Sequence, residues 1–276
     1  MRTLVHPGPV HAQRIDSVQD EPHMLAFVLQ PGMALNEALT APLVAAGMRS
    51  GTIAFGGGTL SPFRYVMPGP PDSDAHVAYF SAPHEPAGET RVERANATFG
   101  WQGDKPFVHV HGAWIEPDGT RRGGHMLPHE CVVARAIQAR AWGFAAAEIA
   151  TAPDAETNFT LLQLRGRSVE GARGVVARMR PNLDITLAVE DVARRHGLRD
   201  ATLLGSVGSL VGARFTDGRV VEDHATEVLI RSGAVRDGIA TLDLLVVDMA
   251  GRVHEGTLLR GENAVCITFD VMLEAT

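Results

Sequence analysis

Cysteine is almost absent from this sequence. Cys131 and Cys266 are the two cysteines among 276 residues, and each lies within an apolar run. Two such thiols provide no disulfide framework of the kind that small secreted domains use. No apolar run is long enough to span a membrane, and residues 1–23 have neither the apolar core nor the cleavage site of a signal peptide. These absences predict a cytoplasmic protein that does not bind membranes.

Clustered positive charge is also missing. The chain has 25 Lys and Arg residues against 32 Asp and Glu residues, which gives a net charge of −7. A surface that binds duplex DNA needs clustered basic side chains, because neutralising phosphates releases counterions. The densest basic groups are Arg121-Arg122 and Arg194-Arg195, and Arg165-Gly166-Arg167 lacks the prolines and basic flanks of an AT-hook. The sequence therefore predicts no strong binding to duplex DNA.

An internal repeat organises what is present. Residues 31–65 align without gaps on residues 181–215, at an offset of 150. Residues 107–133 align on residues 239–265, at an offset of 132. Two long matches in the same order are typical of duplicated domains. Because the offset falls from 150 to 132, the first copy carries 18 additional residues between the two blocks.

Each copy predicts the same elements. An extended segment leads into a helix, expected over 34–46 and 184–196, and a glycine ends each helix. Strands and turns follow, so each copy is expected to form a mainly antiparallel sheet with one packed helix, an α/β (α+β) fold. The predicted boundaries are an arm (1–23), a first domain (24–164), a linker (165–174) and a second domain (175–276).

Several local features are also predicted. Pro42 is expected to kink the first helix or to end it early. Residues 144–149 are expected to form one strand, and Gly205–Ser209 a glycine-rich loop. The additional residues of the first copy begin with an aperiodic stretch over 67–74, which predicts a loop.

The segment Phe107–Leu127 carries the candidate chemistry. It begins as an alternating strand in which His109 and His111 lie on one face. Pro117-Asp118-Gly119 predicts a turn, and a hairpin of this length returns His125 beside the first two imidazoles. A His-x-His pair alone is more often hydrogen-bonded than metallated. Three imidazoles at one point, however, are typical of a divalent metal site, most often zinc, with an open fourth position.

The second copy lacks this set of ligands. Thr241, Asp243 and Thr257 stand where the first copy has the three histidines. One Asp and two Thr make a poor site for a transition metal. The comparison predicts a metal in the first domain only, and a second domain that keeps the fold. Gly123 and Gly124 of the first copy remove side chains where a ligand or another backbone must come close.

The histidine hairpin resembles the plant-and-prokaryote-conserved (PPC, also PCC) domain, which is attached to AT-hook motifs in plants. The family's H-x-H strand, acidic-Gly turn and G-G-H-L element are matched by His109 and His111, by Asp118-Gly119 and by Gly123-Gly124-His125-Met126. Prokaryotic members stand alone and are usually labelled candidate DNA-binding proteins. The resemblance implies an α/β fold, assembly into trimers and, as in some prokaryotic members, a metal on these histidines.

Catalysis by a zinc-bound water would need a general base within hydrogen-bond reach. His129 and Glu130 follow His125 in sequence and are the candidates; the alternatives are a surface histidine and a structural ion pair. Arg64 is a candidate for binding a substrate carboxylate, and Tyr65 for placing a hydroxyl at the site. Roles in the fold are the alternatives for both.

The loop of Gly56, Gly57, Gly58 and Thr59 is the candidate substrate-binding segment. It lacks the Lys-Ser/Thr of a P-loop and the glycine spacing of a dinucleotide site. The PPC resemblance implies that this loop lies near the histidines, where it would shape a pocket for a small molecule.

Three functions remain open at this point. The first is a metal-dependent hydrolase or lyase that acts on a small molecule at the first domain. The second is a DNA-associated regulator, as the family label suggests, and the third is a metal-binding structural module without catalysis. The acidic charge weighs against the second, and the loss of the histidines from one copy favours the first. The resemblance implies a homotrimer with six domains; pairing of the two domains within one chain is the alternative.

Overall fold

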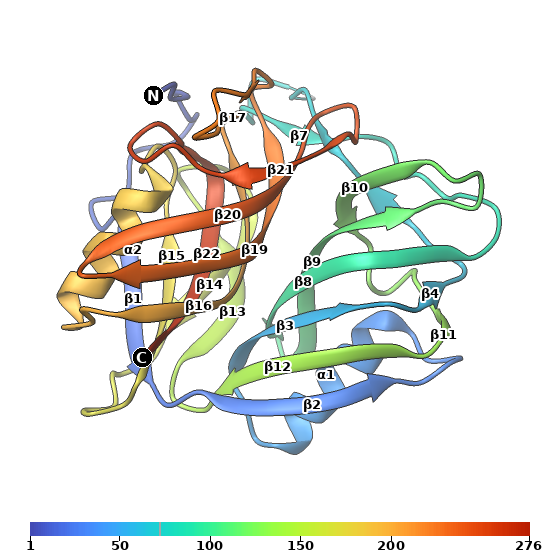
Figure 1. The fold of residues 1–276 in the computed structure, drawn as a ribbon, viewed down its shortest axis with the longest axis horizontal. Helices are drawn as coiled ribbons and strands as arrows, with labels where there is room; N and C mark the ends of the chain where they lie inside the picture. The colour runs from blue at the N-terminus through green and yellow to red at the C-terminus, as the bar shows by residue number, and fades with distance from the viewer. Residues whose placement is uncertain (72) are drawn as a thin grey trace.

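Two large, mainly antiparallel sheets, each with one helix, make up most of the described part of the protein, and two short two-stranded sheets accompany them (Figure 1). The computed structural model describes residues 1–71 and 73–276, so the loop predicted over 67–74 lies partly outside the described residues. Each sheet belongs to one of the two sequence repeats. The predicted fold class, two mainly antiparallel α/β units in tandem, is confirmed.

The first domain has its main strands in the spatial order β2-β12-β3-β8-β9-β10, with β5 beyond β10. Its main elements are β2 (His23–Leu29), α1 (Leu35–Ala45), β3 (Ser50–Gly56), β8 (Thr90–Gln102), β9 (Lys105–Ile115), β10 (Arg121–Met126) and β12 (Ile137–Phe144). Its short strands are β4 (Thr59–Leu60), β5 (Tyr65–Val66), β6 (Pro68–Gly69), β7 (Tyr79–Phe80) and β11 (Val133–Arg135).

The second domain repeats this order as β15-β22-β16-β19-β20-β21. Its elements are β15 (Gly174–Met179), α2 (Ile185–Arg195), β16 (Ala201–Leu210), β17 (Ala213–Arg214), β18 (Val220–Val221), β19 (Thr226–Arg236), β20 (Ile239–Val247), β21 (Val253–Thr257) and β22 (Val265–Ala275). The first sheet also includes β13 (Glu148–Pro153) and β14 (Thr160–Arg165), which pair with each other, and β13 has one further pairing with β8.

The strand registers confirm the duplication. In the β9–β10 hairpin Ile115 is paired with Arg121, and in the β20–β21 hairpin Val247 is paired with Val253. These pairs are related by the sequence offset of 132. The two helices begin and end 150 residues apart and lie within the predicted ranges. α1 continues past Pro42 to its last residue, so the prediction of an early end was wrong.

The strand predicted over 144–149 is interrupted by a turn. β12 ends at Phe144, and β13 begins at Glu148. The Asp20 carboxylate accepts hydrogen bonds from the backbone N–H groups of Ala146 and Ala147, at 2.7 and 2.9 Å. The buried carboxylate of Asp20, far away in the sequence, therefore stabilises this turn. The apolar pattern of residues 144–149 alone did not predict it.

The glycine-rich loop predicted over Gly205–Ser209 is instead part of β16. A Cβ atom on Gly205 would lie 2.1 Å from the hydroxyl oxygen of Thr52, which belongs to β3 of the first domain. The glycine is therefore required by the close approach of two strands from different domains rather than by a turn.

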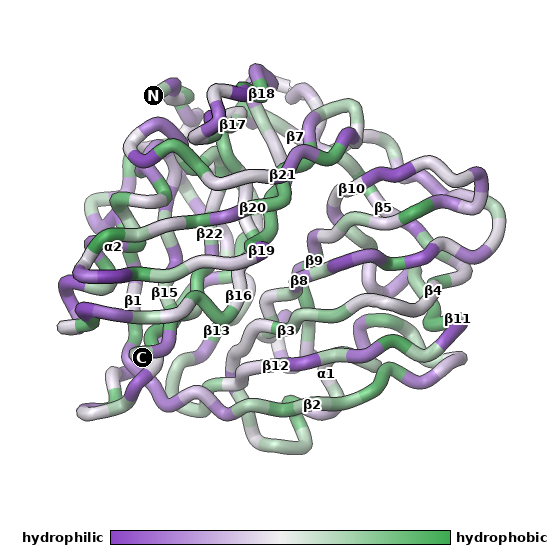
Figure 2. Tube along the Cα trace, in the orientation of Figure 1, coloured by the Kyte–Doolittle hydropathy of each residue, from purple (hydrophilic) through white to green (hydrophobic). Residues whose placement is uncertain are grey.

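The N-terminal arm is part of the second domain's sheet. β1 (Ile15–Asp20) pairs antiparallel with β15 along its whole length and covers that edge. No strand among residues 1–71 and 73–276 covers the equivalent strand of the first sheet, β2, which forms the end of the strand order. Figure 2 shows hydrophobic residues along β2, where Met24 and Val28 are exposed. The first sheet therefore ends in an open edge of apolar character.

The two domains pack against each other within one chain, the arrangement considered above as the alternative to a stacked trimer. Ala113 of β9 lies in a buried cluster with Leu229, Leu245 and Val247 of the second domain. The backbone N–H of Gly123 donates to the carbonyl oxygen of Gly251 at 3.2 Å. In the part of the chain that the structure describes, no helix has the length and apolar character needed to cross a membrane.

Candidate metal centre

The three histidines converge as the hairpin pattern predicts. His109 and His111 lie on β9, and His125 on β10 is directly paired with His111. One ring nitrogen of each histidine lies within 4.8 Å of those of the other two. Among the described residues, these three form the one group of His, Cys, Asp and Glu side chains with the spacing of a metal site.

The two glycines before His125 allow the hairpin to fit into its surroundings. A Cβ atom on Gly123 would lie 2.5 Å from a methyl group of Val247 in the second domain. Gly124 has a φ of +153°, and a Cβ atom there would lie 2.5 Å from the carbonyl oxygen of Val66. Both positions exclude a side chain, as the sequence predicts.

His111 is held by two groups of the second domain. Its Nδ1 lies 3.0 Å from the backbone carbonyl oxygen of Val228. Because a carbonyl can only accept, Nδ1 carries a proton, and in the neutral form of the ring the lone pair is on Nε2. This Nε2 lies 2.6 Å from a carboxylate oxygen of Glu227, without the alignment of a hydrogen bond. Two lone pairs at this distance repel unless a cation lies beside them.

The other two histidines are neutral. Burial lowers the pKa of His109 well below its usual value, and the charge of His111 adds to this effect. Burial likewise lowers the pKa of His125, with contributions from both neighbouring histidines. The buried Nδ1 of His125 has no hydrogen-bond partner among the described residues. Neutral imidazoles with free lone pairs, next to a buried carboxylate, fit a divalent metal ion such as zinc.

The histidines line a cavity of about 280 Å³ between the two domains. The second domain provides part of the wall, including Glu227 and Asp270. Glu227 is 6% exposed; burial acts to raise the pKa of its carboxyl group, but the interaction with the His111 imidazole outweighs burial and lowers this pKa. The site is therefore formed by both domains, although the first one provides all three histidines.

Aromatic side chains lie at the exposed side of this cavity. Tyr79 and Phe80 come from the inserted region of the first copy, and Phe159 comes from the β13–β14 connection. The Phe80 ring lies 5.3 Å from the His125 ring, measured between centroids. Tyr79 and Phe80 are each more than a third exposed. The insertion that distinguishes the first copy thus gives the cavity an aromatic wall.

The residues predicted to be catalytic do not line this cavity. Arg64 forms ion pairs with Glu130 and Glu85. The hydroxyl of Tyr65 donates to Glu116 at 2.6 Å. The His129 ring is stacked on Phe107, which is itself a cavity residue. The geometry of the cavity therefore gives no support to the predicted roles of Arg64, Tyr65, His129 and Glu130, and these roles stay predictions.

The predicted substrate-binding loop also lies outside the histidine cavity. Thr59 donates from its hydroxyl to Glu89 at 2.8 Å. Gly57 has a φ of +90°, and a Cβ atom on Gly58 would lie 2.3 Å from the carbonyl oxygen of Ala136. Neither these residues nor Gly56 are part of the cavity wall. The loop's glycines serve a tight bend and close packing, and its role in binding stays a prediction.

The second copy has other residues at the positions equivalent to His111 and His125. Asp243 is paired with Thr257 in the register that pairs His111 with His125. The Asp243 carboxylate forms an ion pair with Arg231 at 3.3 Å. The residue equivalent to His111 thus takes part in a partly exposed ion pair.

Comparison with known proteins gives matches among solved structures, whereas no protein-family model and no curated protein matches the chain. A PPC protein from Pyrococcus horikoshii is 14% identical with a TM-score of 0.41, over 56% of this chain and 97% of its own. A metal-containing protein from Archaeoglobus fulgidus is 16% identical with a TM-score of 0.43, over 53% and 97%. A hypothetical protein from Salmonella enterica is 21% identical with a TM-score of 0.42, over 55% and 99%.

Half of the chain matches a PPC protein. This is the family that the histidine hairpin resembles in sequence. Each of these three proteins is matched over nearly its whole length by about half of this chain.

Proposed function

We propose that this protein is a metal-dependent hydrolase or lyase for small molecules, with zinc held by His109, His111 and His125. The observation that carries the proposal is the convergence of three imidazoles on the wall of the cavity between the domains. One ring nitrogen of each lies within 4.8 Å of those of the other two. When bound, zinc would supply a Lewis acid that polarises a carbonyl oxygen or lowers the pKa of a water molecule.

The protein's own residues would prepare the site for this chemistry. The Val228 carbonyl fixes the tautomer of His111 and points its Nε2 lone pair toward the other histidines. Glu227 places a buried negative charge beside that nitrogen, which would attract a cation. The aromatic wall formed by Tyr79 and Phe80 offers apolar surface to a substrate.

Elemental analysis of the purified protein tests the proposal. We expect one divalent ion per chain, most often zinc, bound in the first domain only. A variant with all three histidines replaced by alanine should contain none. Two ions per chain, or an unchanged metal content in the triple variant, would contradict the proposed site.

Binding to duplex DNA is expected to be weak, which separates this proposal from a regulator. The net charge of −7 provides no excess of basic side chains to displace counterions from phosphates. An electrophoretic mobility-shift assay in about 150 mM salt should show no complex at sub-micromolar protein. A shift under those conditions, with a steep decrease as salt rises, would favour the regulator instead.

A further inference from the structure

A second buried carboxyl group, Asp270, lies on the second-domain wall of the histidine cavity. It is 3% exposed and belongs to β22, where Phe269 and Val271 flank it. Its Oδ2 has no hydrogen-bond partner among the described residues. A buried carboxyl oxygen without a partner is costly, so a stable fold would retain it only if the position serves another purpose.

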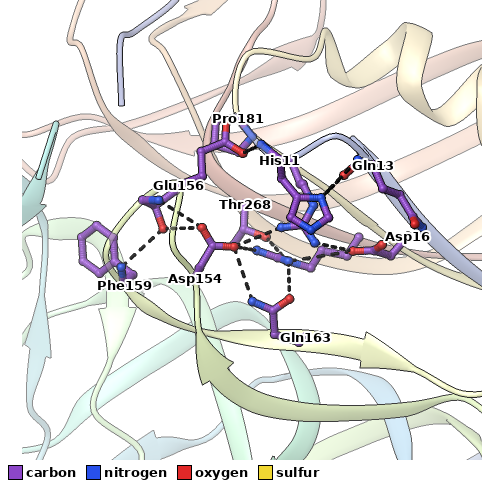
Figure 3. Close-up of polar contacts among 12 residues, drawn as sticks. His11, Gln13, Asp16, Asp154, Glu156, Phe159, Gln163, Pro181 and Thr268 are labelled. Atoms are coloured by element: carbon purple, nitrogen blue, oxygen red, sulfur yellow. Dashed lines mark hydrogen bonds and ion pairs between the residues drawn. The ribbon is translucent and has the colours of Figure 1, made fainter. Parts of the chain in front are cut away.

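The nearest cation in the sheet does not neutralise Asp270. Arg178 of β15 is directly paired with it, but the guanidinium turns toward other groups. It donates to Thr268 at 3.0 Å, to Gln163 at 2.7 Å and to Asp154 at 3.0 Å, and Figure 3 shows these three acceptors around it. Arg178 and Thr98 act on the pKa of Asp270, but its Oδ2 has no hydrogen bond of good geometry among the described residues and belongs to a residue of the cavity wall.

The electrostatic surroundings place this exchange near neutral pH. Burial raises the pKa of Asp270 to about 7, while Arg178, the Thr98 hydroxyl and His111 act to lower it. Arg178 belongs to β15 and His111 to β9, and the titratable groups that line the cavity with Asp270 include Glu227 and the three histidines. A carboxyl group with such a pKa is present in both protonation states at neutral pH, which is the condition for efficient general acid–base catalysis.

We propose that Asp270 transfers protons to and from the substrate in the histidine cavity, and that the substrate is an uncharged ester with an apolar or aromatic group. This inference rests on the proposed metal-dependent function. The second domain, which has lost its own histidines, thus provides the acid–base group for the site of the first.

The substrate class follows from the cavity wall. Among the described residues that line the cavity, none is Lys or Arg, while Glu227 and Asp270 bring negative charge. An anionic substrate would therefore be repelled wherever it did not touch the metal. Tyr79, Phe80 and Phe159 provide the contact surface for an apolar or aromatic group.

The proton transfers balance over one turnover of ester hydrolysis. A lone pair of a water oxygen attacks the carbonyl carbon and forms a C–O bond, and the π pair of the C=O bond moves to the carbonyl oxygen, to return when the alcohol leaves. The Asp270 carboxylate takes the proton from the water O–H bond that breaks. The bond between the carbonyl carbon and the alcohol oxygen then breaks, and its electron pair stays on that oxygen. Asp270 gives its proton to this oxygen and returns to the carboxylate, so the products are a carboxylic acid and an alcohol.

An infrared titration of the full-length protein tests the inference without knowledge of the natural substrate. In the metal-free wild type, the carbonyl band of one buried carboxylic acid should titrate with a midpoint near neutral pH. Adding zinc should lower this midpoint by about one unit or more, because a nearby cation favours the carboxylate. The band should be missing in Asp270→Asn and present in Asp243→Asn, a matched control outside the cavity.

The outcomes distinguish this inference from the proposed function. If zinc binds but the midpoint of the infrared titration of the wild type does not move, Asp270 is not beside the metal and the inference is overturned. This measurement uses the wild type alone. A band that persists in Asp270→Asn overturns it as well. If no zinc binds to the wild type, the proposed function fails and the inference fails with it.

Hydrolysis of p-nitrophenyl acetate tests the assignment of the substrate class. With zinc content unchanged, Asp270→Asn should lower kcat/KM roughly 100-fold and remove the change of rate around neutral pH. Asp243→Asn should leave both the rate and the pH profile unchanged. A wild-type rate no higher than that of the triple histidine variant would overturn the assignment of an ester substrate. A pH profile of Asp270→Asn that equals that of the wild type would overturn the role of Asp270 in proton transfer.

Discussion

Replacing either His109 or His125 by alanine is expected to remove most of the bound metal. Structural zinc sites in small peptides bind with about 10–16 kcal/mol, so the loss of one of three imidazoles should cost roughly 3–5 kcal/mol. That corresponds to a decrease in affinity of about 100-fold or more. Competition with a chromophoric chelator would measure it. His111→Ala should behave similarly, but its contacts with Val228 and Glu227 make the result harder to interpret.

His129→Ala and His84→Ala are the matched controls, because both histidines lie outside the cavity wall. Each should retain zinc with the affinity of the wild type. His129 follows His125 closely in sequence but lies outside the cavity. This control therefore also tests whether zinc binding depends on position in the folded structure rather than on position in the sequence. A loss of zinc in His129→Ala equal to that in His125→Ala would contradict the three-histidine site.

Metal binding should also change the resistance to unfolding. A ligand present at 100 times its dissociation constant stabilises the folded state by about 2.7 kcal/mol. We therefore expect a chelator to lower the melting temperature of the wild type and to leave that of His125→Ala unchanged. The second domain contributes to the same site, so both domains should unfold at a lower temperature when the metal is removed.

The first half of the site was predictable because it is local in sequence. The alternation around His109 and His111, the turn before residue 120 and the return to His125 all follow from residues within one hairpin. His129 was predicted to be a general base because it, too, lies close to His125 in sequence. However, the backbone turns between Leu127 and Glu130, where the N–H of Glu130 donates to the Leu127 carbonyl, and His129 ends beside Phe107.

The other half of the site depends on how the two domains pack, which the repeat does not determine. Glu227 and Asp270 are more than 100 residues away from the histidines in sequence. One signal was available: an acidic residue within the apolar run Val265–Leu273 indicates a carboxyl group that is buried for a reason. Its position beside the histidines could be recognised only in the folded chain.

Asp154 is expected to be the most sensitive position outside the cavity. It lies between β13 and β14 and is 5% exposed. One of its carboxylate oxygens accepts from Arg178 at 3.0 Å and from Arg180 at 3.1 Å, and both arginines are buried (Figure 3). The other oxygen accepts from the backbone N–H of Thr157 at 3.0 Å. This carboxylate thus joins the segment between the domains to the sheet of the second domain.

Asp154→Ala should lower the free energy of unfolding by about 3–5 kcal/mol, because two buried guanidinium groups lose a shared partner. Urea denaturation at pH 7 would measure the change. Asp191→Ala is the matched control. Its carboxylate also pairs with two arginines, Arg194 and Arg195, but on the surface of α2, where such pairs contribute less than about 1 kcal/mol. Equal effects of the two substitutions would show that the buried cluster does not stabilise the fold.

The pH dependence gives an independent check on Asp154. Burial raises the pKa of this carboxyl group, but Arg178 and Thr157 outweigh burial and lower it to about 2, from an ordinary value of 3.8. A group whose pKa is lower in the folded state contributes stability above its unfolded pKa and loses it as the pH falls toward the folded pKa. The wild type should therefore lose up to about 2 kcal/mol from this group between pH 4 and pH 2. Asp154→Asn should lack this part of the acid dependence; if its stability falls as steeply as that of the wild type over the same interval, the acid sensitivity has another source.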